Sequence, residues 1–167
     1  MALASRQMGI YTREKDLALG FDPGRDKTGF AFVNFDGELL LSGIFPSNET
    51  EKFFDDFTPY IVERKIDFSA EEIISQVKFI AVGNGTTSRD FTEKLRTITG
   101  HEIITVDEKN TTIEARNIYW KIHRPGIFLR FLPEGMRVPP RVVDDLAAFA
   151  VALRGLKKYR DIRRNKL

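Results

Sequence analysis

The chain has 167 residues, a length that suits one domain with a core of its own. It contains no cysteine, which excludes disulfides, thiol catalysis and thiolate metal sites, and its formal net charge of +2 is too small to indicate a nucleic-acid partner by itself. No apolar run approaches the roughly 20 residues that span a bilayer, and residues 1–16 lack the apolar segment of a signal peptide, so we expect a cytoplasmic protein without a membrane partner.

The first part of the chain predicts a meander of strands. Residues 17–21 form a short apolar run, the pattern of a buried strand. Residues 28–34 alternate and are rich in Phe and Val, and they are followed by the hairpin dipeptide Asp36-Gly37 and a third strand over 38–45. A helix with apolar residues near helical spacing is expected next, over residues 49–65.

After a linker at residues 67–72, helices and short strands alternate. Strands are expected over 77–82 and 102–106, and helices over 88–99, 111–123 and 140–158. The order βββαβαβα predicts an α/β domain, namely a five-stranded mixed sheet flanked by helices on both faces. We expect this domain over 17–158, after an N-terminal arm (1–16) and before a basic tail (159–167).

Basic residues gather towards the C-terminus. Beyond Arg154 they far outnumber the acids, and four more arginines lie in or beside the loop rich in Pro, Gly and Arg at residues 124–140, among them Arg137 and Arg141. Such a distribution suits a surface that binds phosphates, but cations also complement the C-terminal end of a helix dipole. Charge alone leaves both interpretations open.

Four groups of residues are candidates for chemistry, and the first is Asp22-Pro23-Gly24. A carboxylate at the C-terminal end of a central strand points into the crevice where such sheets bind ligands, and Gly24 lets a phosphate or metal approach the backbone. Asp, Pro and Gly are also turn residues, and the local pattern alone favours a tight turn.

The second group follows the strand at 77–82. Its glycines, with Asn84 and Thr86 between and after them, precede a helix N-terminus, which is a common anion site. It is not a Walker loop, because no Lys stands where one is required. Ser88 as a simple helix cap is an equally good interpretation.

The third and fourth groups are acidic. Asp107 and Glu108 end the strand at 102–106, before Thr111 and Glu114, whose spacing suits a capping box. Asp144 and Asp145 begin an alanine-rich stretch of the last helix, where acids are favoured by the helix dipole.

Together, these groups place carboxylates at the ends of two strands and on a helix that can reach both. Hard divalent cations such as Mg²⁺ or Mn²⁺ take oxygen ligands of this kind. Two such ions can activate water and stabilise the leaving oxygen when a phosphodiester is hydrolysed.

The motifs resemble those of one known group, the YqgF (RuvX) family in the RuvC-like branch of the RNase H-like superfamily. Residues 19–24 resemble the first-strand motif of RuvC-type Holliday junction resolvases. The run from Asp107 to Ala115, which includes Thr111 and Thr112, resembles the DExxTTxEA motif of YqgF proteins, and 143–148 resembles their C-terminal helix motif. Asn84 stands where RuvC resolvases have a nearby Glu, which favours YqgF.

The resemblance implies an RNase H-like fold and a set of site residues. Asp22, Glu108 and either Asp144 or Asp145 match the family's catalytic, metal-binding acids, and the register leaves the choice between the two aspartates open. We expect nucleic-acid contacts from glycine, asparagine, threonine and arginine side chains or backbone at Gly24, Asn84, Thr86, Thr111, Thr112, Arg137 and Arg141.

The implied function is a metal-dependent endonuclease for structured nucleic acid. It would act on pre-16S rRNA, with pre-ribosomal particles as a further expected partner, as a monomer or homodimer. A Holliday junction resolvase acting on branched DNA is one alternative. A non-catalytic, nucleic-acid-binding ribosome-assembly factor is another. A third is an ATP-using enzyme of the actin and sugar-kinase type, whose phosphate loops also resemble residues 22–29, although that fold needs two such domains and this chain has room for one.

Overall fold

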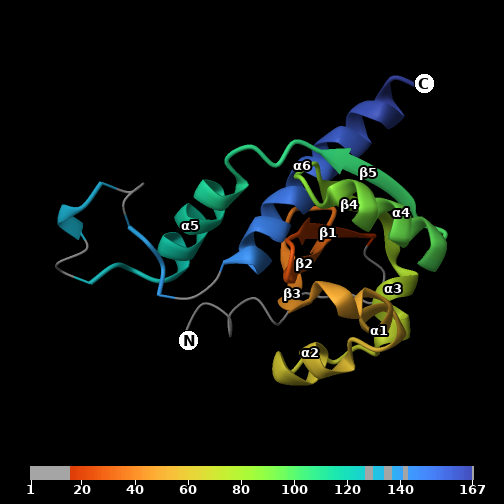
Figure 1. Ribbon diagram of the computed structural model, residues 1–167, viewed down its shortest axis with the longest axis horizontal. Helices are drawn as coiled ribbons and strands as arrows, with labels where there is room; N and C mark the ends of the chain where they lie inside the picture. Colours follow the sequence, from red (N-terminus) through yellow and green to blue (C-terminus); the bar gives the residue numbers. More distant parts are fainter. Residues whose placement is uncertain (1–15, 127–129, 134–136, 141–142, 167) are drawn as a thin grey trace.

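The computed structural model describes residues 16–126, 130–133, 137–140 and 143–166. Within them, one five-stranded sheet lies between helices on both of its faces (Figure 1). Its strands are β1 (Leu17–Pro23), β2 (Lys27–Asn34), β3 (Leu39–Pro46), β4 (Val77–Gly83) and β5 (Glu102–Val106). The predicted mixed α/β architecture and all five predicted strands are confirmed.

The strands are arranged in the order β3-β2-β1-β4-β5. Each pair in the β1-β2-β3 meander is antiparallel, whereas β1, β4 and β5 run parallel to one another. At the turn predicted between β2 and β3, Gly37 has a φ of 87°, a conformation that glycine adopts at little cost. The carboxyl ends of β1, β4 and β5 therefore lie at one edge of the sheet, where a ligand site is expected in such folds.

The helices differ more from the prediction than the strands do. They are the 3₁₀ turn η1 (Ser47–Glu49) and helices α1 (Thr50–Asp55), α2 (Thr58–Glu63), α3 (Ala70–Ser75), α4 (Ser88–Ile98), α5 (Thr111–Ile122) and α6 (Asp144–Arg164). The single helix expected over 49–65 is wrong, because Pro59 in a helix interior would lose a backbone hydrogen bond; the chain instead becomes extended at Asp56 and starts a new helix at Thr58.

Part of the expected linker at 67–72 is helical. Ser69 and Glu72 form a capping box at the start of α3. The capping box predicted at Thr111 and Glu114 is wrong, because α5 begins after Asn110, whose φ is 68°, and no side chain caps it. The last helix begins later and ends later than expected, so that residues 159–164 continue α6.

The two faces of the sheet bury different side chains. One face is aromatic, and helices α1 to α4 cover it with a cluster that includes Phe21, Phe30, Phe53 and Phe57. The other face is built mainly from alanine and valine, and α6 lies along it. Side chains alternate along a strand, so the even-numbered residues of β1, from Ala18 to Asp22, are on the α6 face.

Helix α6 lies very close to the sheet. A Cβ atom on Gly20 of β1 would lie 2.4 Å from the carbonyl oxygen of Ala148, and one on Gly155 of α6 would lie 2.5 Å from the Cβ of Ala81. Helix α5 packs against α6 and extends away from the sheet (Figure 1). In the described part of the chain, no helix combines the length and apolar character that a membrane crossing requires.

Candidate functional site

Asp22 lies near the carboxyl end of the central strand β1, on the α6 face. It pairs with Gly29 of β2, and the pairing of Phe21 with Val82 places Gly83 of β4 at its other side. Asp22 is half-buried. It therefore has a glycine next to it on each neighbouring strand, which leaves space above the sheet for other groups.

The space above Gly29 is taken by the first turn of α6. A Cβ atom at Gly29 would lie 2.0 Å from the carbonyl oxygen of Asp144. This contact involves backbone on both sides, so only glycine allows the helix to approach this closely. The approach places Asp144 beside Asp22.

The space above Gly83 is taken by Glu108, from the loop between β5 and α5. A Cβ atom on Gly83 would lie 2.6 Å from Glu108 Oε2, and one on Gly85 would lie 1.9 Å from Oε1. The backbone N–H of Glu108 donates to Asn84 Oδ1 at 3.1 Å, which joins this loop to the loop after β4. Glu108 thus faces Asp22 from the side opposite to Asp144.

The pKa values of these acids reflect how close together they lie. The pKa of Asp22 is raised from 3.8 to about 7, first by burial and then by the charges of Glu108 and Asp144. The pKa of Asp144 is also raised, by burial and by Asp145, while Lys27 acts in the opposite direction. A bound cation would relieve this repulsion. We call Asp22, Glu108 and Asp144 the acidic edge.

Asp145 acts on Asp144 through its charge, but its own side chain lies elsewhere. It is only 3% exposed, and it accepts a hydrogen bond of 3.2 Å from Ser42 Oγ on β3. The charges that raise the pKa of Asp22 come from Glu108 and Asp144. The structure therefore places Asp144 beside Asp22, and Asp145 between the helix and the sheet. The role of Asp145 as a metal ligand stays a prediction, which the position of its side chain does not favour.

Two of the residues predicted to contact nucleic acid hold the loops of the site together, and their contact with nucleic acid stays a prediction. Gly24 donates its N–H to the carbonyl of Lys27 at 3.0 Å and closes the β1–β2 turn. Thr111 is buried and donates to the carbonyl of Glu108 at 2.8 Å, so it fixes the acidic loop. Thr86 and Thr112 are exposed.

The structure describes one of the two arginines that were predicted to contact nucleic acid. The guanidinium of Arg137 donates to the carbonyls of Leu132 at 2.9 Å and Arg130 at 3.1 Å, within its own loop. Arg141 lies outside the described residues. The basic loop is therefore at least partly bound to itself, and its contact with phosphates stays untested.

Sequence reasoning missed several polar side chains at this edge. Thr87 Oγ1 donates to the carbonyl of Pro23 at 2.6 Å, and Ser47 Oγ donates to the carbonyl of Gly24 at 2.8 Å, so both support the turn after Asp22. Lys27 acts electrostatically on Asp144. Ser42, which donates to Asp145, left a signal as a polar residue between the apolar pairs Leu40-Leu41 and Ile44-Phe45, whereas the roles of the others depend on tertiary contacts.

The acidic edge offers the oxygen ligands that Mg²⁺ and Mn²⁺ prefer. Among the described residues, however, no three His, Cys, Asp or Glu side chains form a group that could hold a metal ion. Mg²⁺ commonly takes only one or two carboxylates and completes its shell with water and substrate phosphates. The donor chemistry therefore fits an ion shared with a ligand, held by Asp22 with Glu108 or Asp144.

Comparisons with known proteins do not support the family resemblance. No family model matches the chain, and no curated protein matches it. Among the similar solved structures are a ROK hexokinase from Thermus thermophilus (17% identity, TM-score 0.37) and a ROK family glucokinase from Streptomyces griseus in complex with glucose and AMPPNP (14%, 0.36). A third is the Aquifex aeolicus member of the Ppx/GppA family (13%, 0.34).

The matches cover 60%, 60% and 66% of this chain, respectively, and 38%, 36% and 41% of the other chains, so this chain spans less than half the length of each. They are sugar kinases and a Ppx/GppA protein rather than RuvC-type or YqgF nucleases. This finding overturns the predicted membership of the YqgF family, together with the nuclease, resolvase and rRNA-processing functions that followed from it. The motif likeness misled because Asp, Gly, Thr and Ala recur at the strand ends and helix starts of many folds.

Proposed function

We propose that this chain is an enzyme that binds Mg²⁺ or Mn²⁺ at the acidic edge and, together with that ion, the phosphate groups of a nucleotide. The single observation that carries the proposal is the flanking of Asp22 by Asp144 and Glu108. Each of these acids lies over a glycine that neighbours Asp22 on an adjoining strand. Half-buried carboxylates that repel one another are costly unless they are paired or hold a cation, so an ion explains this arrangement best.

The chain's own residues have separate parts in this proposal. Asp22 would hold the ion, with Glu108 or Asp144 as its second anionic contact. The glycines after β4 precede α4, and the N-terminus of such a helix favours a phosphate. A bound divalent cation would neutralise the acids and polarise a phosphate oxygen.

The sheet supports the proposal through its topology. The acidic edge lies at the carboxyl ends of β1, β4 and β5, the position at which open α/β sheets bind ligands. The strand order β3-β2-β1-β4-β5, in which β2 runs in the direction opposite to the other four strands, supports the RNase H-like class that we propose for this sheet. This class carries no activity of its own.

The first test measures Mn²⁺ binding by electron paramagnetic resonance, with Mg²⁺ as competitor, for the wild type and for Asp22→Asn. We expect saturable binding that Mg²⁺ displaces, and an affinity at least about tenfold lower in the variant. Asp67→Asn is the matched control, because Asp67 is exposed on a loop away from the acidic edge. Wild-type protein that binds neither ion would refute the proposal.

The second test adds ATP and follows nucleotide binding by displacement of a fluorescent analogue, and phosphate release in parallel. We expect tight nucleotide binding only when Mg²⁺ is present and Asp22 is intact. If the protein binds the metal but the metal does not affect ATP binding, the ion site stands and the proposed nucleotide is wrong.

A further inference from the structure

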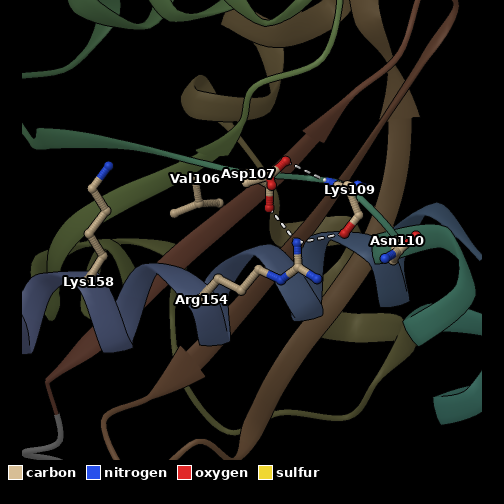
Figure 2. Close-up of a pocket in the computed structure, with 6 residues that line it drawn as sticks. All are labelled: Val106, Asp107, Lys109, Asn110, Arg154 and Lys158. Carbon is tan, nitrogen blue, oxygen red and sulfur yellow. Dashed lines mark hydrogen bonds between the residues drawn. The ribbon is translucent and has the colours of Figure 1, made fainter.

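A second hollow, basic in character, lies where the end of β5 meets the middle of α6 (Figure 2). Its volume is about 430 Å³, within the usual range for small-molecule sites. Its lining residues are Val106, Asp107, Lys109, Asn110, Arg154 and Lys158. Three of them are cationic and one is acidic, so the hollow has an excess of positive charge.

Arg154 lies at the centre of this hollow and organises it. Its Nη1 atom donates to the carbonyls of Asp107 and Lys109, the latter at 3.0 Å (Figure 2). Its Nη2 atom pairs with Glu114. These contacts tie the loop between β5 and α5 to α6. A guanidinium has five N–H groups, so Arg154 retains donors beyond the three that these contacts use in the described part of the chain.

The two lysines lie on either side of Arg154. Lys158 extends from α6 at one end of the hollow, and Lys109 comes from the β5–α5 loop at the other (Figure 2). The ammonium of Lys158 donates to the carbonyl of Thr105 at 2.8 Å and can make two further hydrogen bonds. The hollow therefore offers an anion an organised guanidinium between two ammonium groups.

We propose that this hollow binds the phosphate group of a small phosphate ester, independently of the acidic edge. Arginine and lysine together are a common phosphate-binding set, because a guanidinium supplies directional donors and an ammonium supplies a compact charge. The hollow is larger than one phosphate requires, which leaves room for the organic part of the ester.

An extended polyanion fits the same helix less well. Further along α6, Arg160 donates to the carbonyl of Phe35, and Arg163 pairs with Glu102. Both of these arginines lie outside the hollow. Arg154 is likewise paired, with Glu114, but it lines the hollow and keeps two of its five N–H groups beyond the three contacts given above. Lys157 does not line the hollow; it lines an adjoining groove between α5 and α6, to which Arg154 also belongs. The three cationic side chains of the hollow line one small volume, which suits a compact anion better than an extended one.

The test is titration calorimetry in EDTA with three probes, namely AMP, inorganic phosphate and adenosine. We expect AMP and phosphate to bind with one-site saturation, and adenosine not to bind. Lys158→Gln and Lys109→Gln should each weaken AMP binding by about tenfold or more, as expected for a lost charge-assisted hydrogen bond. Lys157→Gln, one residue away on the same helix and exposed, should leave the affinity within about twofold.

Two outcomes would overturn the inference. One is the absence of phosphate and AMP binding to the wild type. The other is equal weakening by Lys157→Gln and Lys158→Gln, which would indicate a diffuse basic surface. Because the titration contains no divalent ion, Asp22→Asn should bind AMP as the wild type does, so this result and the test of the acidic edge are independent of each other.

Discussion

The two faces of the sheet differ in the size of their side chains, and the difference decides where ligand chemistry can occur. On the aromatic face, rings such as Phe30 and Phe53, with centroids 4.7 Å apart, fill the layer between the sheet and the short helices α1 to α4. On the α6 face, glycines and alanines let the helix backbone nearly touch the strands. Bulky residues stabilise one layer, while small ones position a helix end.

The position of that helix end determines the acidic edge. Because α6 rests on Gly29, its first residue, Asp144, lies next to Asp22. Aromatic side chains at the same sites would hold the helix further away and separate the two acids. Changes on the aromatic face should therefore affect stability alone, and changes on the α6 face should affect both stability and ion binding.

The largest effect on stability is expected at the centre of the aromatic face. Phe53 is 3% exposed and meets Phe21, Phe30, Phe45 and Phe57. Phe53→Ala should lower the free energy of unfolding by about 4 kcal/mol through lost burial and a cavity. Urea unfolding measures this loss. Mn²⁺ affinity of the folded variant should be unchanged, and a loss of affinity would contradict the division between the faces.

Gly29→Ala tests the α6 face, with a somewhat smaller expected cost. Its Cβ would meet the Asp144 carbonyl at 2.0 Å, so the first turn of α6 must move. We expect a loss of about 3 kcal/mol in unfolding free energy together with weaker Mn²⁺ binding. Gly100→Ala is the control, because no atom lies within 4 Å of its added Cβ. If Gly29→Ala binds Mn²⁺ like the wild type, close approach of the helix does not determine the site.

The third prediction concerns pH and the charge of Asp22. Because its pKa rises from 3.8 to about 7 on folding, the folded protein keeps a proton that the unfolded chain releases between about pH 4 and 7. The free energy of unfolding should therefore fall as pH rises through this range. A shift of this size corresponds to about 4 kcal/mol for a fully buried group, and solvent screening of the half-buried Asp22 reduces it. Asp22→Asn removes that dependence and should be more stable than the wild type by about 2 kcal/mol at pH 8, with the difference vanishing near pH 4.

Urea unfolding in EDTA at both pH values measures this difference. The exposed Asp67→Asn control should show no pH-dependent gain. A gain for Asp22→Asn that is equal at pH 4 and pH 8 would contradict a raised pKa as its cause. Saturating Mg²⁺ should reduce the gain at pH 8, because an ion that binds the charged Asp22 stabilises the wild type.

The smallest effect is expected at Asp145, beneath the helix. Ser42→Ala removes the hydroxyl that donates to Asp145 Oδ2, and we expect a loss of about 1 kcal/mol. Mn²⁺ affinity should change little, because Ser42→Ala keeps the charge of Asp145, which acts on Asp144, and Asp145 is not among the causes of the raised pKa of Asp22. A clear loss of affinity in titrations of Ser42→Ala would instead connect Asp145 to the ion.

The strands and the candidate acids could be predicted from local patterns. Period-two alternation in residues 28–34 and the turn residues Asp36-Gly37 reflect backbone geometry that neighbouring residues determine. Ser69 and Glu72 carried the signal of the capping box that starts α3, and Pro59 carried the signal of the break before α2. The structure follows both signals, but the prediction did not. The apolar spacing of 49–65 suggested one continuous helix despite Pro59, and the polarity of 67–72 suggested a linker despite the capping pair.

Local sequence by itself thus determined the five strands, the main turns and the presence of acids at Asp22, Glu108 and Asp144. Only the tertiary structure decided which acids meet. Asp144 and Asp145 are adjacent and chemically alike, but the helix rests on Gly29 and turns one towards Asp22 and the other towards Ser42. Glu114, expected to cap its own helix, pairs instead with Arg154 of α6. These choices depend on contacts between residues far apart in the chain, which no local pattern records.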